Sequence, residues 1–224
     1  MLLQAEKIAK QYFRKTGTAN YFYAVRPLTM EIREGEVAVL TGRSGSGKTT
    51  LLNMLSGLLR PTEGTVRLGN SDLYSLGDTA LSRIRSETIG IVPQGRSAID
   101  TLTVMENILL PGALYGRTTS PETAAEWMEK LGIVHLADSR PAELSGGELR
   151  RMAIARALTQ KPELIFADEP TGDLDNENTG RVLSILHEYA HAQNKAVFVV
   201  THENDALEYA DRVYVLDNGQ LSVQ

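Results

Sequence analysis

The segment GRSGSGKTT, residues 42–50, constrains the fold of this chain more than any other. It matches the pattern G-x-x-x-x-G-K-[S/T] in full, with the apolar stretch EVAVL before it and a helix-forming stretch after it. Its glycines let the backbone turn tightly around an anion, and the following helix would present its positive N-terminal end to the same point. The segment therefore predicts a strand–loop–helix unit that binds the phosphates of a nucleoside triphosphate.

Two side chains of this loop have a predicted chemical role. Lys48 would reach the β- and γ-phosphates, and the hydroxyl of Thr49 would ligate Mg²⁺. The alternative is a Gly/Ser-rich turn that binds no ligand. That alternative does not explain why a strand directly precedes the full motif and a helix directly follows it. The loop alone leaves kinases, GTPases, helicases and transport ATPases open. The residues expected to surround the phosphates are Gly42, Arg43, Ser44, Gly45, Ser46, Gly47, Lys48, Thr49 and Thr50.

Two acidic residues follow a second strand of the buried type. The segment LIFADEP, residues 164–170, has four apolar residues and then Asp168 and Glu169. Because ligands of parallel α/β sheets lie at the carboxyl ends of the strands, we expect Asp168 to hold Mg²⁺ through water. Glu169 would accept a proton from the attacking water or orient it. Two ordinary surface acids are the alternative; a carboxylate at Glu169 favours hydrolysis over transfer to a bound acceptor.

A second glycine-rich site begins the helix-forming stretch LSGGELRRMAIARAL, residues 144–158. Ser145 predicts an N-cap, but capping does not explain two successive glycines, Gly146 and Gly147. Bare N–H groups, a helix dipole and a hydroxyl together predict a second phosphate contact. Because the first loop already surrounds the triphosphate from one side, we expect this contact to come from a second copy of the chain, arranged head to tail.

Composition limits the class of protein. A length of 224 residues suits one large domain or one domain with a small lobe, and a net charge of −5 gives no support to a nucleic-acid binder. The sequence has no cysteine, which excludes disulfides and thiolate chemistry. No stretch approaches the roughly 18 apolar residues of a membrane helix, so we expect contact with a membrane only through a partner.

Alternating strand and helix patterns predict the fold. Residues 2–12 and 21–32 predict an antiparallel pair joined by a turn at 14–20. Residues 95–160 have helical spacing and predict an inserted lobe, in which Ser120–Pro121 begins a helix that Gly132 ends. The rest predicts a mainly parallel sheet with helices on both faces. Strands are expected at 36–42, 64–70, 88–94, 163–167 and 195–201, helices at 48–59, 180–193 and 203–210, and a hairpin with an Asn–Gly turn at 211–223.

In order and spacing, these motifs resemble the ATPase subunits of the ABC family over nearly the whole chain. The resemblance is carried by the phosphate loop, Gln94 after TIGIVP, LSGGE (residues 144–148, the signature segment), LIFADE, TGDLD and THE. It is most similar to the small stand-alone subunits of the lipoprotein-release, macrolide-exporter and FtsE-like group. The implied fold is α/β: a P-loop NTPase core with a mixed, mainly parallel sheet, an N-terminal antiparallel β part and an inserted helical lobe. One ABC-type ATPase domain would span 1–224, with the helical subdomain at 95–160.

The resemblance also implies residue roles. Tyr12 would stack on adenine, with Phe13 as a rival. Gln94 would sense Mg²⁺ and the γ-phosphate and connect to a membrane partner. Asp175 would lie in a loop that crosses a dimer interface, and His202 would contact the γ-phosphate as a switch. The residues expected to contact the ATP of the other subunit are Ser145, Gly146, Gly147 and Glu148.

The implied activity is ATP hydrolysis by a subunit of a membrane transporter. The cofactors would be ATP and Mg²⁺, the metal held by Thr49, Gln94 and Asp168. Two copies would close around two ATP molecules and drive a transmembrane permease on a separate chain to export or extract a peptide, lipid, lipoprotein or drug. The subunit would be cytoplasmic, peripheral on the inner face of the cell membrane, with no nucleic-acid partner.

Three alternatives remain open. A regulatory ATPase of the FtsE-like kind would drive a partner that moves no solute. A DNA-repair or chromosome ATPase head would need a long coiled coil or zinc modules, and the chain has neither heptads nor cysteine. A small-molecule kinase is disfavoured by Glu169 and His202. Two residues depart from the family pattern: Pro93, where Phe is usual, is expected to alter the groove for the membrane partner, and Leu149, where Gln is usual, to affect hydrolysis or dimer affinity.

Overall fold

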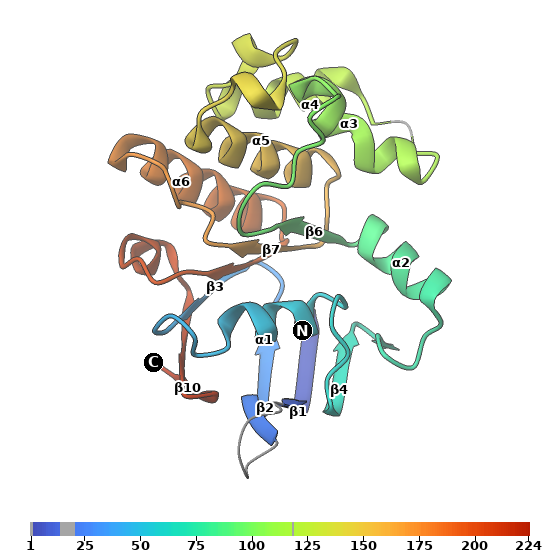
Figure 1. Ribbon diagram of the computed structural model, residues 1–224, viewed down its shortest axis with the longest axis vertical. Coiled ribbons are helices and arrows are strands. Elements are labelled where there is room, and N and C mark those ends of the chain that lie inside the picture. The colour runs from blue at the N-terminus through green and yellow to red at the C-terminus, as the bar shows by residue number, and fades with distance from the viewer. Residues whose placement is uncertain (1, 14–20, 118) are drawn as a thin grey trace.

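The chain forms two β-sheets and six α-helices in the parts that a computed structural model describes, residues 2–13, 21–117 and 119–224 (Figure 1). The turn predicted at 14–20 lies outside the described residues. A four-stranded antiparallel sheet has the order β2-β1-β4-β5, and a six-stranded sheet has the order β10-β9-β3-β8-β7-β6. The strands of the first sheet are β1 (Leu3–Phe13), β2 (Tyr21–Ile32), β4 (Glu63–Leu68) and β5 (Ser71–Asp72).

The six-stranded sheet is mainly parallel, as the strand–helix alternation predicts. Its strands are β3 (Glu36–Thr41), β6 (Ile89–Val92), β7 (Leu164–Asp168), β8 (Ala196–Val200), β9 (Arg212–Asp217) and β10 (Gln220–Val223). All pairs are parallel except β9–β10, which form the predicted hairpin over Asn218 and Gly219, both at positive φ. The α/β class with an N-terminal antiparallel part is confirmed.

Helices cover both faces of this sheet, and side chains of β3 show the division. Ala38 and Leu40 pack into the hydrophobic cluster shared with α1 (Lys48–Leu55), α2 (Asp78–Glu87) and the antiparallel sheet. Val37 and Val39 pack into the opposite cluster, shared with the remaining four helices. Two buried faces explain why the central strands are continuously apolar. The four helices are α3 (Val104–Leu114), α4 (Pro121–Lys130), α5 (Gly146–Thr159) and α6 (Asn176–Ala192), seen above the sheet in Figure 1.

The helices between residues 95 and 160 pack on one another. The Ser120 side chain caps α4, Pro121 occupies its first turn, and α4 is followed by Gly132 at positive φ, as predicted. α3, α4 and α5 share one cluster with the sheet, so that a separate helical subdomain at 95–160 stays a prediction. Among the described residues, no helix is both long and apolar enough to cross a bilayer.

Two predicted elements differ from the structure, and the structure has further elements that the sequence analysis does not predict. The helix expected to reach residue 59 ends at Leu55, because Gly57 takes a φ of 76° that a helix cannot continue. The segment expected as a helix at 203–210 is a short 3₁₀ helix, Asp205–Tyr209. Two further 3₁₀ turns, Val134–Leu136 and Pro141–Glu143, precede α5. α2 was not predicted; it has a single buried side chain, Leu81, and so carries no clear apolar periodicity.

Candidate functional site

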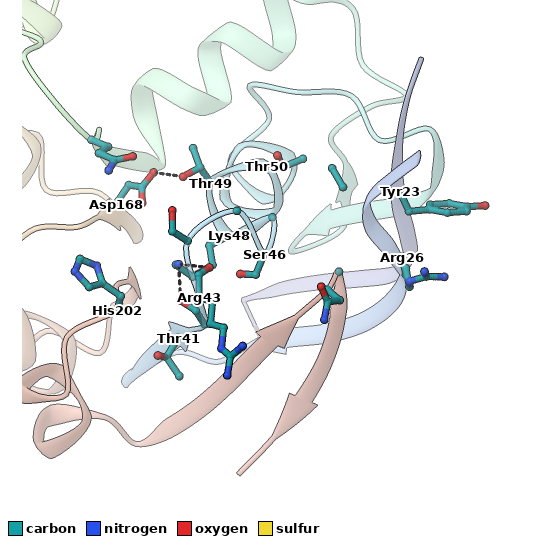
Figure 2. Close-up of a pocket in the computed structure, with 18 of the residues that line it drawn as sticks. Tyr23, Arg26, Thr41, Arg43, Ser46, Lys48, Thr49, Thr50, Asp168 and His202 are labelled. Atoms are coloured by element: carbon teal, nitrogen blue, oxygen red, sulfur yellow. Dashed lines mark hydrogen bonds between the residues drawn. The ribbon is translucent and has the colours of Figure 1, made fainter. Parts of the chain in front are cut away.

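A cleft of about 1170 Å³ lies at the carboxyl ends of β3, β7 and β8. The whole predicted phosphate loop, residues 42–50, lines it. It is also lined by four residues from three later parts of the chain: Gln94, Asp168, Glu169 and His202. Figure 2 shows Asp168 and His202 beside the loop. The topology therefore brings together the phosphate loop and every residue predicted for metal binding and catalysis.

The phosphate loop is built on the turn from β3 into α1. Gly47 is the N-cap of α1 in the left-handed region, with a φ of 104°, and no side chain caps the helix. A Cβ at Gly47 would overlap the carbonyl O of Ala24 in β2, so that glycine is required there. The first N–H groups of α1 are left for a ligand, and the helix dipole favours an anion at that point.

Lys48 holds the centre of the loop. Its side chain is 8% exposed, and its Nζ donates to the carbonyl O of Gly42 at 2.7 Å and of Arg43 at 3.2 Å. The ammonium is thus placed under the loop (Figure 2). The hydroxyl of Ser46 is buried without a hydrogen-bond partner in the part of the chain that the structure describes. A buried cation and an unpaired hydroxyl beside a helix N-terminus fit a bound polyphosphate.

Thr49 and Asp168 meet from α1 and β7. The Thr49 hydroxyl donates to Oδ2 of Asp168 at 2.8 Å, and Asp168 is only 3% exposed. Burial, with the negative charge of Glu169, raises the pKa of Asp168, while the Thr49 hydrogen bond opposes the rise. An oxygen pair of this kind suits Mg²⁺, which keeps several waters. The described residues contain no group of three His, Cys, Asp or Glu that could hold a metal ion alone.

Glu169 is held in place by residues that follow β8. Its Oε2 accepts a hydrogen bond from the Thr201 hydroxyl at 3.1 Å, and its Oε1 lies 2.9 Å from Nδ1 of His202. The backbone of Glu169 is in the left-handed region, with a φ of 50°, a strained conformation for a non-glycine residue. Its carboxylate raises the pKa of His202. A carboxylate that two side chains fix at the cleft is suited to orienting a water molecule.

The signature segment lies apart from this cleft. Ser145, Gly146 and Gly147 line a separate depression of about 470 Å³, together with Asp175 and neighbouring residues. The Ser145 side chain caps α5 as predicted: it accepts the N–H of Glu148 at 3.3 Å, while Oε2 of Glu148 accepts the N–H of Ser145 at 2.8 Å. The N–H and the hydroxyl of Ser145 both donate to Oε2 of Glu148 and lower the pKa of that carboxyl. Within one chain, the signature segment and the phosphate loop therefore line two different depressions.

Comparisons with known proteins agree with this geometry. The model of the ABC transporter family matches residues 25–172. The chain belongs to the ABC transporter family. It is similar to the lipoprotein-releasing system ATP-binding protein LolD of Pseudomonas fluorescens, 41% identical over 87% of this chain and 86% of that protein. LolD of Shewanella oneidensis is 36% identical over 100% of this chain and 96% of that protein.

A solved structure shows the same architecture. A dimeric ATP-binding cassette in a post-hydrolysis state, bound to ADP and Pi, superposes with a TM-score of 0.91 at 33% identity, covering 99% of this chain and 98% of that one. The protein is an ABC ATPase cassette that binds adenine nucleotides, and the predicted family, fold and ATPase activity are confirmed. The predicted phosphate loop lines the cleft described above.

The aromatic residues of β1 and β2 differ in whether they line the cleft. Tyr12 does not line the cleft; its ring lies 6.0 Å from that of Phe22, which does. Tyr23 and Arg26 of β2 also line the cleft and were missed from the sequence (Figure 2). Phe13 packs against Tyr21, outside the cleft. The aromatic run YFY at 21–23 is the sequence signal from which the cleft residues of β2 could have been predicted. Adenine stacking by Tyr12 stays a prediction.

Proposed function

We propose that the chain is the ATP-hydrolysing subunit of a membrane transporter and works as a homodimer with two ATP molecules between its copies. The observation that carries this proposal is the separation of two phosphate-binding elements on one chain: the loop at 42–50 lines the cleft, and Ser145–Gly147 line another depression. A two-fold pair lets each chain complete the other's site. A similar cassette is dimeric and bound to ADP and Pi, which supports the same assembly here.

Binding of ATP would rest on the phosphate loop. Lys48 and the free N–H groups of α1 would hold the β- and γ-phosphates, and the cleft side formed by Phe22, Tyr23 and Arg26 would face the nucleoside. Thr49, Asp168 and Gln94 would hold Mg²⁺, which neutralises charge on the phosphates when bound. Ser145–Gly147 of the second copy would add N–H groups and a hydroxyl to the γ-phosphate, with Asp175 in the contact between copies.

Hydrolysis would be carried out by Glu169. Its carboxylate would take the proton of the attacking water, and Thr201 would hold it in orientation. His202, whose Nδ1 lies 2.9 Å from Oε1 of Glu169, would contact the γ-phosphate and connect it to the same carboxylate. Catalysis would come from positioning and electrostatics, without a covalent intermediate.

The partner would be a transmembrane permease on a separate chain, which places the subunit at the inner face of the cell membrane. Exposed apolar side chains at Ile99, Leu114 and Tyr115 are available for a partner helix close to Gln94 in sequence. Because the LolD relatives are named for lipoprotein release, we favour a lipoprotein as the substrate. Transport of a fluorescent lipopeptide by the reconstituted complex would separate this function from regulation of a non-transporting partner.

The test of the assembly uses Glu169→Gln, which keeps the shape of the side chain and removes the base. With ATP and Mg²⁺, this variant is expected to form a dimer by light scattering and to lose turnover. The control combines Glu169→Gln with Gly146→Asp, which places a negative charge in the depression lined by Ser145–Gly147. Because this charge would repel the γ-phosphate of the other copy, the double variant should stay a monomer. A Glu169→Gln chain that stays monomeric with ATP and hydrolyses it normally would refute both the dimer and the base.

A further inference from the structure

A buried arginine joins the helix of the signature segment to the residue before Gln94. Arg150 lies on α5 one turn after Gly146 and is 8% exposed. Its Nη1 donates to the carbonyl O of Pro93 at 2.8 Å. Pro93 follows the last residue of β6 and directly precedes Gln94, which lines the nucleotide cleft. A charged donor in buried surroundings makes one of the stronger hydrogen bonds, so this contact fixes the end of β6 to α5.

The same guanidinium borders the acidic side of the cleft. A Cβ built at Gly172, three residues after Glu169, would lie 3.9 Å from Nη2 of Arg150. The positive charge of Arg150 also opposes the rise that burial causes in the pKa of Asp168. One buried side chain of α5 therefore lies between the two segments that carry Gln94 and Glu169.

A second arginine of α5 offers a comparison. Arg156 donates to the carbonyl O of Ser97 at 2.9 Å and to the Ser97 hydroxyl at 2.6 Å. Ser97 comes three residues after Gln94 and is not among the residues that line the cleft. Arg156 is therefore a similar guanidinium on the same helix, bonded to the same loop at a point farther from the nucleotide.

We propose that Arg150 is a positioning residue for ATP hydrolysis, which sets the place of Gln94 through the Pro93 carbonyl and makes Gln94 move with the N-terminus of α5. The proposal rests on the proposed docking of the signature segment on the nucleotide of a second copy, because that docking is what would displace α5. The Pro93 carbonyl and the Gln94 nitrogen belong to one planar peptide unit, so a displacement of this carbonyl carries the backbone of Gln94 with it, and the fixed φ of Pro93 removes one rotation that could absorb the shift. Gln94 would then reach its working position only when α5 is docked.

The first test compares Arg150→Met with Arg156→Met in the purified chain. Arg150→Met is expected to lower kcat about tenfold and to leave the KM for ATP within about twofold, since Lys48 and the phosphate loop are untouched. Arg156→Met is expected to lose similar stability and to keep kcat within about twofold of the parent. Arg150→Lys, which retains one donor for the Pro93 carbonyl, is expected to recover part of the loss. Equal losses of kcat in the two Met variants would overturn the proposal.

The second test asks whether Arg150 acts through Gln94. In a Gln94→Ala background, Arg150→Met is expected to lower kcat by less than about twofold, because the residue it positions is already gone. A further full tenfold loss in that background would overturn the proposal. If Arg150→Met does not fold, Arg150→Lys and Arg150→Gln are compared in both backgrounds by the same criterion. Failure of the dimer itself would show separately, as a Glu169→Gln chain that stays monomeric with ATP.

Discussion

The bond from Thr201 to Glu169 gives the sharpest prediction about catalysis. Thr201 is fully buried, and its hydroxyl donates to Oε2 of Glu169 at 3.1 Å while it accepts the N–H of Glu203 at 3.0 Å. Thr201→Val keeps the shape and removes both bonds. A hydrogen bond to a charged group contributes about 1.5–3 kcal/mol to stability, and a chain of this size loses about 2–4 °C of Tm per kcal/mol. We therefore expect the free energy of unfolding to fall by about 2 kcal/mol and Tm by about 4–8 °C.

The effect on hydrolysis separates a catalytic from a structural contribution of this bond. With one of its two side-chain partners removed, Glu169 should lose orientation, and kcat should fall about tenfold with KM for ATP little changed. The control is Thr171→Val: Thr171 is 2% exposed, and its hydroxyl donates to Glu203 instead of Glu169. Both variants should lose stability in thermal unfolding, but only Thr201→Val should lose kcat in a coupled phosphate-release assay. Equal kcat values in the two variants would refute the reasoning.

Three further predictions concern the same cleft. Because burial raises the pKa of Asp168, its ionised form destabilises the fold at pH values above the unfolded-state pKa of 3.8. Asp168→Asn should therefore raise Tm at pH 7 in thermal unfolding while it abolishes Mg²⁺-dependent hydrolysis. A lower Tm in this variant would contradict the reasoning. Because Glu169 raises the pKa of His202, their pairing stabilises the fold below pH 6.5, and this stabilisation is lost as pH rises through the raised pKa. The difference in free energy of unfolding between the parent and His202→Ala, measured by denaturant titration, should therefore close at alkaline pH. A difference that stays constant with pH would count against the pairing. Gly47→Ala should weaken ATP binding more than about tenfold in calorimetry because the loop must distort, whereas unchanged affinity would show that the glycine is not needed.

Local chemistry explains what could be predicted from the sequence. The phosphate loop is contiguous, and its strand, glycines and helix are recognised from neighbouring residues. Its structure and its place at the carboxyl end of a strand were therefore both predictable. The cap of α5 by Ser145 and the hairpin at Asn218–Gly219 are local in the same sense. The family resemblance added the roles of Gln94 and His202, which no spacing argument alone supplies.

Contacts between distant segments could not be predicted in this way. Glu169 and Thr201 are in contact because β7 and β8 are neighbours in the sheet. The order of the strands in a sheet cannot be predicted from the sequence of either strand. The cleft is lined by Phe22 and Tyr23 of β2 and not by Tyr12, the residue of β1 that pairs with Phe22, and the sequence of neither strand shows which of the two paired strands borders the cleft. The helical pattern around Arg150 does not show whether an arginine there is solvated or buried. Its partner is the backbone carbonyl of Pro93, 57 residues away, and a backbone carbonyl cannot be recognised from the sequence as a hydrogen-bond partner.

The most direct measurement is a structure of Glu169→Gln with ATP and Mg²⁺. Two copies of the chain should enclose two nucleotides, and each γ-phosphate should lie within hydrogen-bond distance of Ser145–Gly147 from the opposite copy. A complex in which ATP occupies the cleft while residues 145–147 of every copy remain far from each nucleotide would contradict the account.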